Sequence, residues 1–142
     1  MRNVLAAALL STAALMMISS AATATTTCEP SGLAGRWNSY TLGSAGTEPF
    51  WERCDLRFNR SGKLLSGSTC HTDTNERSVF SGRLTLSSDC QVTGTLTQQF
   101  PGEPPNVCRM VQATLAKGQQ VLSGVGTCKS SKSIFSFTMI RR

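Results

Sequence analysis

Six cysteines spread along the chain constrain its fold more than any other feature. No two of them are close enough to form the C-x-x-C pair that redox motifs and most zinc sites use. An even number of dispersed cysteines is instead typical of a disulfide framework formed in an oxidising compartment. We therefore expect three disulfides, no metal site and no cofactor. The cysteines are Cys28, Cys54, Cys70, Cys90, Cys108 and Cys128.

The N-terminal segment indicates how the chain would reach such a compartment. Arg2 precedes an apolar stretch over residues 4–18, which Ser11 interrupts, and Ala22-Thr23-Ala24 follows. This is the layout of a secretory signal peptide with a small-residue cleavage site. The interrupted stretch is too short for a transmembrane helix, which needs about 20 apolar residues. We expect a signal peptide over residues 1–24, cleaved after Ala24, and one periplasmic or secreted domain over residues 25–142 with no membrane span.

An alternation of apolar and polar residues with a period of two dominates the rest of the chain. In segment 53–59, charged residues separate Cys54, Leu56 and Phe58, and residues 90–96 repeat the pattern. Successive side chains of a strand point to opposite faces, so the pattern predicts half-buried antiparallel strands. Turn-forming residues separate the runs. The expected strands lie near 36–42, 53–59, 63–70, 80–86, 90–98, 107–115, 121–128 and 133–140, with longer connections at 43–52, 71–77 and 99–106.

About eight short strands joined mostly to their neighbours favour an all-β, eight-stranded antiparallel up-and-down barrel; a two-sheet sandwich is the alternative. A closed barrel has the advantage that it leaves no strand edge exposed. Glycines inside the predicted strands fit a tightly coiled sheet, because a missing side chain lets the backbone bend. These glycines are Gly67, Gly82, Gly94, Gly124 and Gly126.

The positions of the predicted turns indicate how the cysteines pair. Two cysteines that lie symmetrically about a hairpin turn face each other across it, at a separation that a disulfide can bridge. The turn at 116–119 is centred between Cys108 and Cys128. The turn at 59–62 lies about one residue from the midpoint of a second pair, an offset that a β-bulge would correct. The predicted pairs are Cys108 with Cys128, Cys54 with Cys70 and, by elimination, Cys28 with Cys90.

Gly35-Arg36-Trp37 opens the first predicted strand, and Arg141 and Arg142 end the last one. This arrangement resembles the calycin barrels, which include lipocalins, avidins and a family of bacterial metalloprotease inhibitors. In calycins a Gly-x-Trp motif lies under a late arginine that closes one end of the barrel. A guanidinium over an indole face contributes about 1 kcal/mol. The resemblance therefore implies an arginine cap at this end.

Residues 33–70 are similar to the opening half of the secreted metalloprotease inhibitors. A cysteine-bearing strand follows the Gly-x-Trp strand, and a second cysteine follows Leu65-Ser66-Gly67. In that family a free N-terminal segment enters the protease cleft. The resemblance implies a protein-binding protease inhibitor whose partner is a secreted protease. The corresponding N-terminal residues are Thr25, Thr26 and Thr27.

The avidins are a competing resemblance, carried by Leu42-Gly43-Ser44 and by the segments 80–84 and 123–141. Avidins hold a small molecule inside the barrel. The resemblance implies a small-ligand carrier in which polar side chains close to the first tryptophan face into the barrel mouth. The residues concerned are Trp37, Asn38, Tyr40 and Ser44.

Two predicted connections carry residues suited to contacting another protein. Phe50 and Trp51 lie in the connection at 43–52, and an aromatic ring at a loop tip buries a large apolar area at low entropic cost. In an alternative arrangement Trp51 folds over the barrel mouth as a lid. Pro104 lies in the connection at 99–106, which its prolines stiffen.

The charges and reactive side chains argue against several functions. The formal net charge of +6 favours acidic partners, but the basic residues are scattered, so we expect no nucleic-acid binding. His71 is the only histidine and stands in a polar stretch without a recognisable nucleophile. We therefore expect a protein without a catalytic site that acts by binding. A protease inhibitor is the first hypothesis, and a small-ligand carrier or an envelope protein held on anionic polymers are the alternatives.

Overall fold

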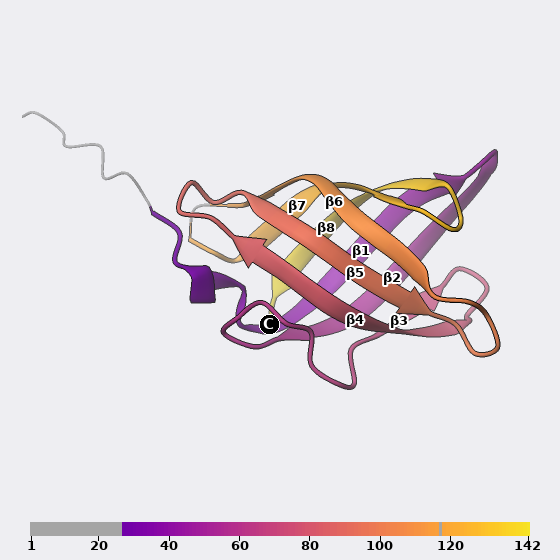
Figure 1. The fold of residues 1–142 in the computed structure, drawn as a ribbon, viewed down its shortest axis with the longest axis horizontal. Helices are drawn as coiled ribbons and strands as arrows, with labels where there is room; N and C mark the ends of the chain where they lie inside the picture. The colour runs from indigo at the N-terminus through magenta and orange to yellow at the C-terminus, as the bar shows by residue number, and fades with distance from the viewer. Residues whose placement is uncertain (1–26, 117) are drawn as a thin grey trace, which may run out of the picture.

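Eight antiparallel strands follow one another in chain order, and the last pairs with the first (Figure 1). The computed structural model describes residues 27–116 and 118–142. The predicted all-β, eight-stranded barrel is confirmed. The sandwich alternative is wrong, because the sheet closes on itself. The elements are a 3-10 helix, η1 (Pro30–Leu33), and the strands β1 (Gly35–Ala45), β2 (Glu48–Phe58), β3 (Thr69–Thr72), β4 (Arg77–Leu86), β5 (Val92–Gln99), β6 (Asn106–Leu115), β7 (Val121–Cys128) and β8 (Ser133–Arg141).

The connections between strands alternate between the two ends of the barrel, because each strand runs antiparallel to the one before it. We call one end the closed end; η1 and the C-terminus lie there, on the left in Figure 1. We call the other end the open end, toward which the long β1–β2 hairpin extends. The closed end holds the connections 59–68, 87–91 and 116–120, and the open end holds 46–47, 73–76, 100–105 and 129–132.

An arginine and a tryptophan cap the closed end. Trp37 is completely buried, and its indole Nε1 donates a 2.9 Å hydrogen bond to the carbonyl of Leu33. The guanidinium of Arg141 lies 4.5 Å from the centre of the Trp37 ring. This is the arginine cap that the calycin resemblance implied. Arg141 also donates hydrogen bonds to the carbonyl oxygens of Gly32, Ala34 and Gln119.

Three disulfides join the cysteines as predicted. Two of them connect direct cross-strand partners, with Cα–Cα distances of 4.0 Å for Cys54–Cys70 and 3.9 Å for Cys108–Cys128. The third, Cys28–Cys90, ties the segment before η1 to the connection between β4 and β5. The barrel therefore carries one crosslink at its closed end and two between neighbouring strands.

The predicted connection at 43–52 is wrong, because β1 and β2 continue through it to a two-residue turn at 46–47. Phe50 pairs with Gly43, and a Cβ atom on Gly43 would lie 2.6 Å from the tip of the Phe50 ring. The missing side chain makes room for the aromatic ring within the sheet. Gly43 and Pro49 suggested a loop, but both are accommodated in paired strands.

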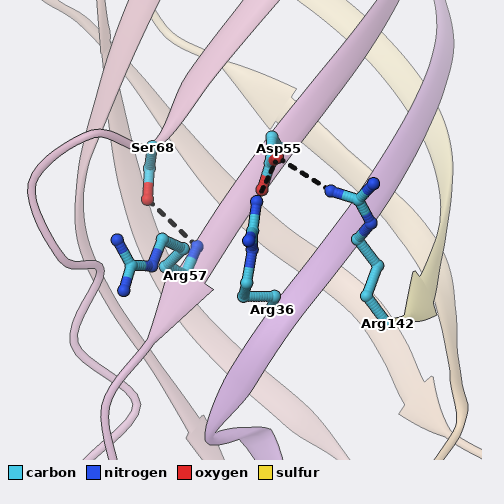
Figure 2. Close-up of polar contacts among 5 residues, drawn as sticks. All are labelled: Arg36, Asp55, Arg57, Ser68 and Arg142. Atoms are coloured by element: carbon cyan, nitrogen blue, oxygen red, sulfur yellow. Dashed lines mark hydrogen bonds and ion pairs between the residues drawn. The ribbon is translucent and has the colours of Figure 1, made fainter.

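The hairpin after β2 also differs from the prediction. The turn begins as expected, with Asn59 Oδ1 accepting hydrogen bonds from the backbone N–H groups of Ser61 and Lys63. Residues 65–68 then form a second turn outside the paired strands, so the strand predicted at 63–70 is reduced to β3. Ser68 Oγ in this turn accepts the backbone N–H of Arg57 at 3.1 Å (Figure 2). The extra turn, and not the predicted bulge, sets the register of this hairpin.

The expected signal peptide over residues 1–24 lies outside the described residues, as do Thr25 and Thr26. Among the residues that the structure describes, no helix is long and apolar enough to cross a membrane. The three disulfides are compatible with a location outside the cytoplasm.

Candidate functional site

The interior of the barrel is packed toward the closed end and hollow toward the open end. Large side chains such as Trp37, Leu56 and Leu84 are fully buried in the packed part. A cavity of about 250 Å³ occupies the hollow part. Four phenylalanines and two aliphatic residues make its wall largely apolar: Phe50, Phe80, Phe100, Phe135, Leu96 and Met110.

Glycines on neighbouring strands give the aromatic rings of this wall their space. Gly126 on β7 pairs with Phe135 on β8, and a Cβ atom on Gly126 would lie 2.4 Å from the Phe135 ring. Gly43 accommodates Phe50 in the same way. The rings therefore lie against bare backbone and line the cavity.

A polar cluster interrupts the apolar wall. Glu52 on β2 is 8% exposed and Gln98 on β5 is 6% exposed, and both line the cavity. The amide nitrogen of Gln98 donates to Glu52 Oε1 at 2.5 Å and to the hydroxyl of Ser78, on β4, at 3.1 Å. Three strands thus hold a buried carboxylate at the side of the cavity.

The environment of Glu52 disfavours its charged form. Burial is the largest cause and raises the pKa of Glu52 above its ordinary value, and the negative charge of Asp73 raises this pKa further. The hydrogen bond from Gln98 acts in the opposite direction. No lysine, arginine or histidine lines this cavity among the described residues.

Glu52 also lies beside the Cys54–Cys70 disulfide. A carboxylate oxygen and the two sulfur atoms all lie within 4.8 Å of one another. The sulfurs are bonded to each other and are not thiolates, which are the form of cysteine that binds metals. This group therefore does not provide a metal-ligating set.

No protein-family model and no curated protein sequence matches the chain. Among solved structures, the barrel is similar to a redesigned β-barrel, mFAP0, whose structure is bound to DFHBI. The TM-score is 0.60 at 14% sequence identity, and the match covers 78% of this chain and 99% of the designed one. This likeness shows the barrel fold.

The side chains predicted to line the barrel mouth do not do so. Trp37 points inward but lies at the closed end, where Arg141 covers it. Asn38, Tyr40 and Ser44 occupy the alternate positions of β1, whose side chains point away from the interior, and Tyr40 is 50% exposed. Successive side chains of a strand point to opposite faces, so Trp37 inside the barrel places the even-numbered residues of β1 on the outside. The prediction did not apply this alternation to β1.

Outward-facing side chains of β1, β2 and β3 instead form a polar groove with Arg142. Asp55 accepts hydrogen bonds from Arg36 at 3.0 Å and from Arg142 at 3.2 Å, both to Oδ2 (Figure 2). His71 also lines this groove, on β3 and not in the predicted connection at 71–77. Exposed ion pairs of this kind contribute little stability.

The residues predicted to contact a protein do not form one surface. Thr27 is exposed beside Cys28, which the disulfide to Cys90 holds at the closed end. Pro104 is exposed in the connection 100–105 at the open end, as the sequence predicted.

Phe50 and Trp51 lie in β2 and not at a loop tip. They point in opposite directions: Phe50 lines the cavity, whereas Trp51 is 49% exposed on the outer face. Trp51 therefore does not form a lid over the barrel mouth.

Sequence reasoning missed the polar cluster of Glu52, Gln98 and Ser78. The period of two contains the signal for Glu52, because Cys54 and Leu56 point inward and Glu52 shares their parity. Extending the predicted strand at 53–59 by one residue toward the N-terminus would have placed this carboxylate inside the barrel.

Proposed function

We propose that the protein binds a compact, largely apolar small molecule in the open half of its barrel and acts without catalysis. The observation that carries this proposal is the cavity, whose apolar wall is interrupted by Glu52 and Gln98. Small-molecule sites generally combine an apolar lining with a few polar groups that orient the ligand.

The size of the cavity limits the ligand. Its volume of about 250 Å³ lies near the lower limit of the roughly 300–1,000 Å³ that is usual for small-molecule sites. An apolar cavity of about 150 Å³ holds benzene. We therefore expect a ligand of one or two rings, or a short chain, with one polar end. The designed barrel with a similar fold, whose structure is bound to DFHBI, supports a binding function.

Filling the cavity tests the proposal. Ala45 lines the cavity at the open end, whereas its neighbour Ser44 belongs to the outward-facing side of β1. We expect Ala45→Phe to weaken binding of the neutral probe 2-phenylethanol at least about tenfold, because the new ring occupies ligand space. Ser44→Phe is the matched control and should leave binding unchanged. NMR titration of the probe into each variant measures both affinities.

Native mass spectrometry of protein purified from its host provides a second readout. A carrier should arrive with a small molecule bound, and Ala45→Phe should arrive empty. If the wild-type protein arrives empty and binds no neutral aromatic probe, the proposal is wrong.

Protease inhibition remains a prediction from the resemblance at residues 33–70. It requires stoichiometric inhibition of a secreted zinc protease, and inhibition should weaken when Thr25, Thr26 and Thr27 are deleted or Trp51 is replaced by alanine. The predicted periplasmic or secreted location rests on the signal peptide over residues 1–24. If that peptide is cleaved after Ala24, the exported protein begins at Thr25, which N-terminal sequencing measures.

A further inference from the structure

We infer that the cavity selects ligands whose polar end is a protonated amine, which pairs with the carboxylate of Glu52. This inference rests on the proposed function and names the chemical class of its ligand. It comes from the juxtaposition of a buried carboxylate, a cavity that no basic side chain of the described residues lines, and a small excess of acidic residues around the opening.

The hydrogen bonding of Glu52 is incomplete. Gln98 donates to Oε1, and among the described residues no donor is bonded to the second oxygen, Oε2, which is not fully buried and stays accessible from the cavity. A buried carboxylate without a cationic partner is costly, because it loses its hydration and gains little in return. An ammonium group has three donors and a full positive charge. A ligand that carries one would therefore supply what the protein does not.

Gln98 holds the carboxylate in place for such a ligand. Its amide nitrogen bonds Glu52 and Ser78 at the same time, so both of its hydrogens have acceptors. Ser78 is fully buried and keeps the amide oriented. The carboxylate therefore does not need to reorganise when a cation arrives, which favours binding.

The open end carries a small excess of acidic residues, although the protein as a whole is basic. The chain has eight acidic residues and a formal net charge of +6. Besides Glu52, four of the eight lie in or directly beside the open-end connections, against three basic residues. An acidic rim attracts cations and repels anions. The acidic residues are Glu48, Asp73, Glu76 and Glu103, and the basic ones are Arg77, Lys129 and Lys132.

The aromatic wall favours the same ligand. Phe50, Phe80, Phe100 and Phe135 line the cavity together with Glu52. The face of an aromatic ring attracts a cation, by about 0.5–2 kcal/mol depending on how far the site is desolvated. An aromatic or aliphatic amine would thus find apolar contacts for its body and favourable electrostatics for its charge. A carboxylate ligand would face repulsion.

Three probes of nearly equal size test the inference on the purified, disulfide-bonded protein. They are 2-phenylethylamine, the neutral 2-phenylethanol and the anionic 3-phenylpropionate. We expect calorimetry or NMR titration to give an affinity for the amine about tenfold or more above that for the alcohol, because a charge-assisted hydrogen bond replaces a neutral one. The carboxylate should bind more weakly than the alcohol.

Variants of two carboxylates on β2 complete the experiment. Glu52→Gln keeps the shape of the side chain and should remove the preference for the amine while the alcohol still binds. Asp55→Asn, on the outer face of the same strand, is the control and should keep the preference.

The possible failures are distinguishable. If the wild-type protein binds the amine and the alcohol equally, or Glu52→Gln keeps the amine preference, the inference is wrong and the proposed function stands. If it is purified from its host without a bound small molecule and binds none of the three probes, the proposed function is wrong and the inference falls with it.

Discussion

Single side chains have opposite energetic roles at the two ends of the barrel. At the closed end Arg141 is paired with the Trp37 ring and with three backbone carbonyls, so its partial burial is compensated. At the open end Glu52 is buried with one donor, which leaves part of its desolvation uncompensated. The first arrangement stabilises the fold, whereas the second costs stability and is typical of a functional site.

Replacing Glu52 should stabilise the protein in a pH-dependent way. Burial raises the pKa of Glu52 in the folded state, so the folded protein binds this proton more tightly than the unfolded chain does. The free energy of unfolding therefore falls as pH rises from the ordinary pKa of glutamate through the raised value. We expect Glu52→Gln to be more stable than the wild type by about 1 kcal/mol at about pH 7, with little difference at about pH 4.

Urea unfolding at the two pH values measures this difference. Glu48→Gln, at an exposed position on the same strand, is the control. It should change the free energy of unfolding by the same small amount at both pH values. A Glu52→Gln variant that is less stable than the wild type near neutral pH would contradict the assignment of an uncompensated charge.

The arginine cap gives a second prediction for single residues. We expect Arg141→Lys to lower the free energy of unfolding by about 2 kcal/mol, because an ammonium cannot stack on Trp37 and reach three carbonyls at once. Arg142→Lys alters only an exposed ion pair with Asp55 and should change stability by less than about 0.5 kcal/mol. Thermal or urea unfolding of the two variants compares them directly, and equal effects would refute the cap.

Glycines inside the strands determine how tightly β4 and β5 pack against each other. Gly82 and Gly94 have φ values of +117° and +130°, a region that residues with a side chain rarely adopt. A Cβ atom on Gly82 would lie 2.5 Å from the carbonyl oxygen of Thr95. Both residues lie within paired strands, as the sequence predicted, whereas Gly67 lies in the turn at 65–68.

Substitution of Gly82 should therefore disturb the whole strand pair. We expect Gly82→Ala to lower the free energy of unfolding by about 2–3 kcal/mol, since backbone on the neighbouring strand would have to move. Ser81→Ala, at the adjacent exposed position, should cost less than about 0.5 kcal/mol. Chemical denaturation measures both, and a neutral Gly82→Ala variant would show that the strands are less tightly coupled than the structure indicates.

The two ends of the barrel differ in how completely they are packed and crosslinked. At the closed end the arginine cap, η1 and the Cys28–Cys90 disulfide restrain the chain. At the open end the cavity leaves interior surface without packing partners, and a bound ligand would supply them. Restraints concentrated at one end allow the other end to keep the proposed binding cavity, which leaves part of the interior unpacked.

Much of this fold could be predicted from the sequence, because the deciding signals are local. The two-residue alternation around Cys54 depends only on neighbours along the chain. A cysteine pair centred on a turn, such as Cys108 and Cys128, needs only the spacing of one hairpin. Prediction failed where glycine and proline are accommodated in paired strands: the β1–β2 hairpin continues past Gly43 and Pro49 because Phe50 packs over the glycine.

The candidate site depends on distances that no local pattern contains. Glu52 and Gln98 are 46 residues apart in the chain, and only the closure of eight strands brings them to the same height in the barrel. The alternation and the cysteine spacing were enough to predict most of the strands, to favour a barrel over a sandwich and to pair the cysteines. Tertiary structure alone decided which half of the interior is packed and which side chains meet in the cavity, because both depend on the register and closure of the complete sheet.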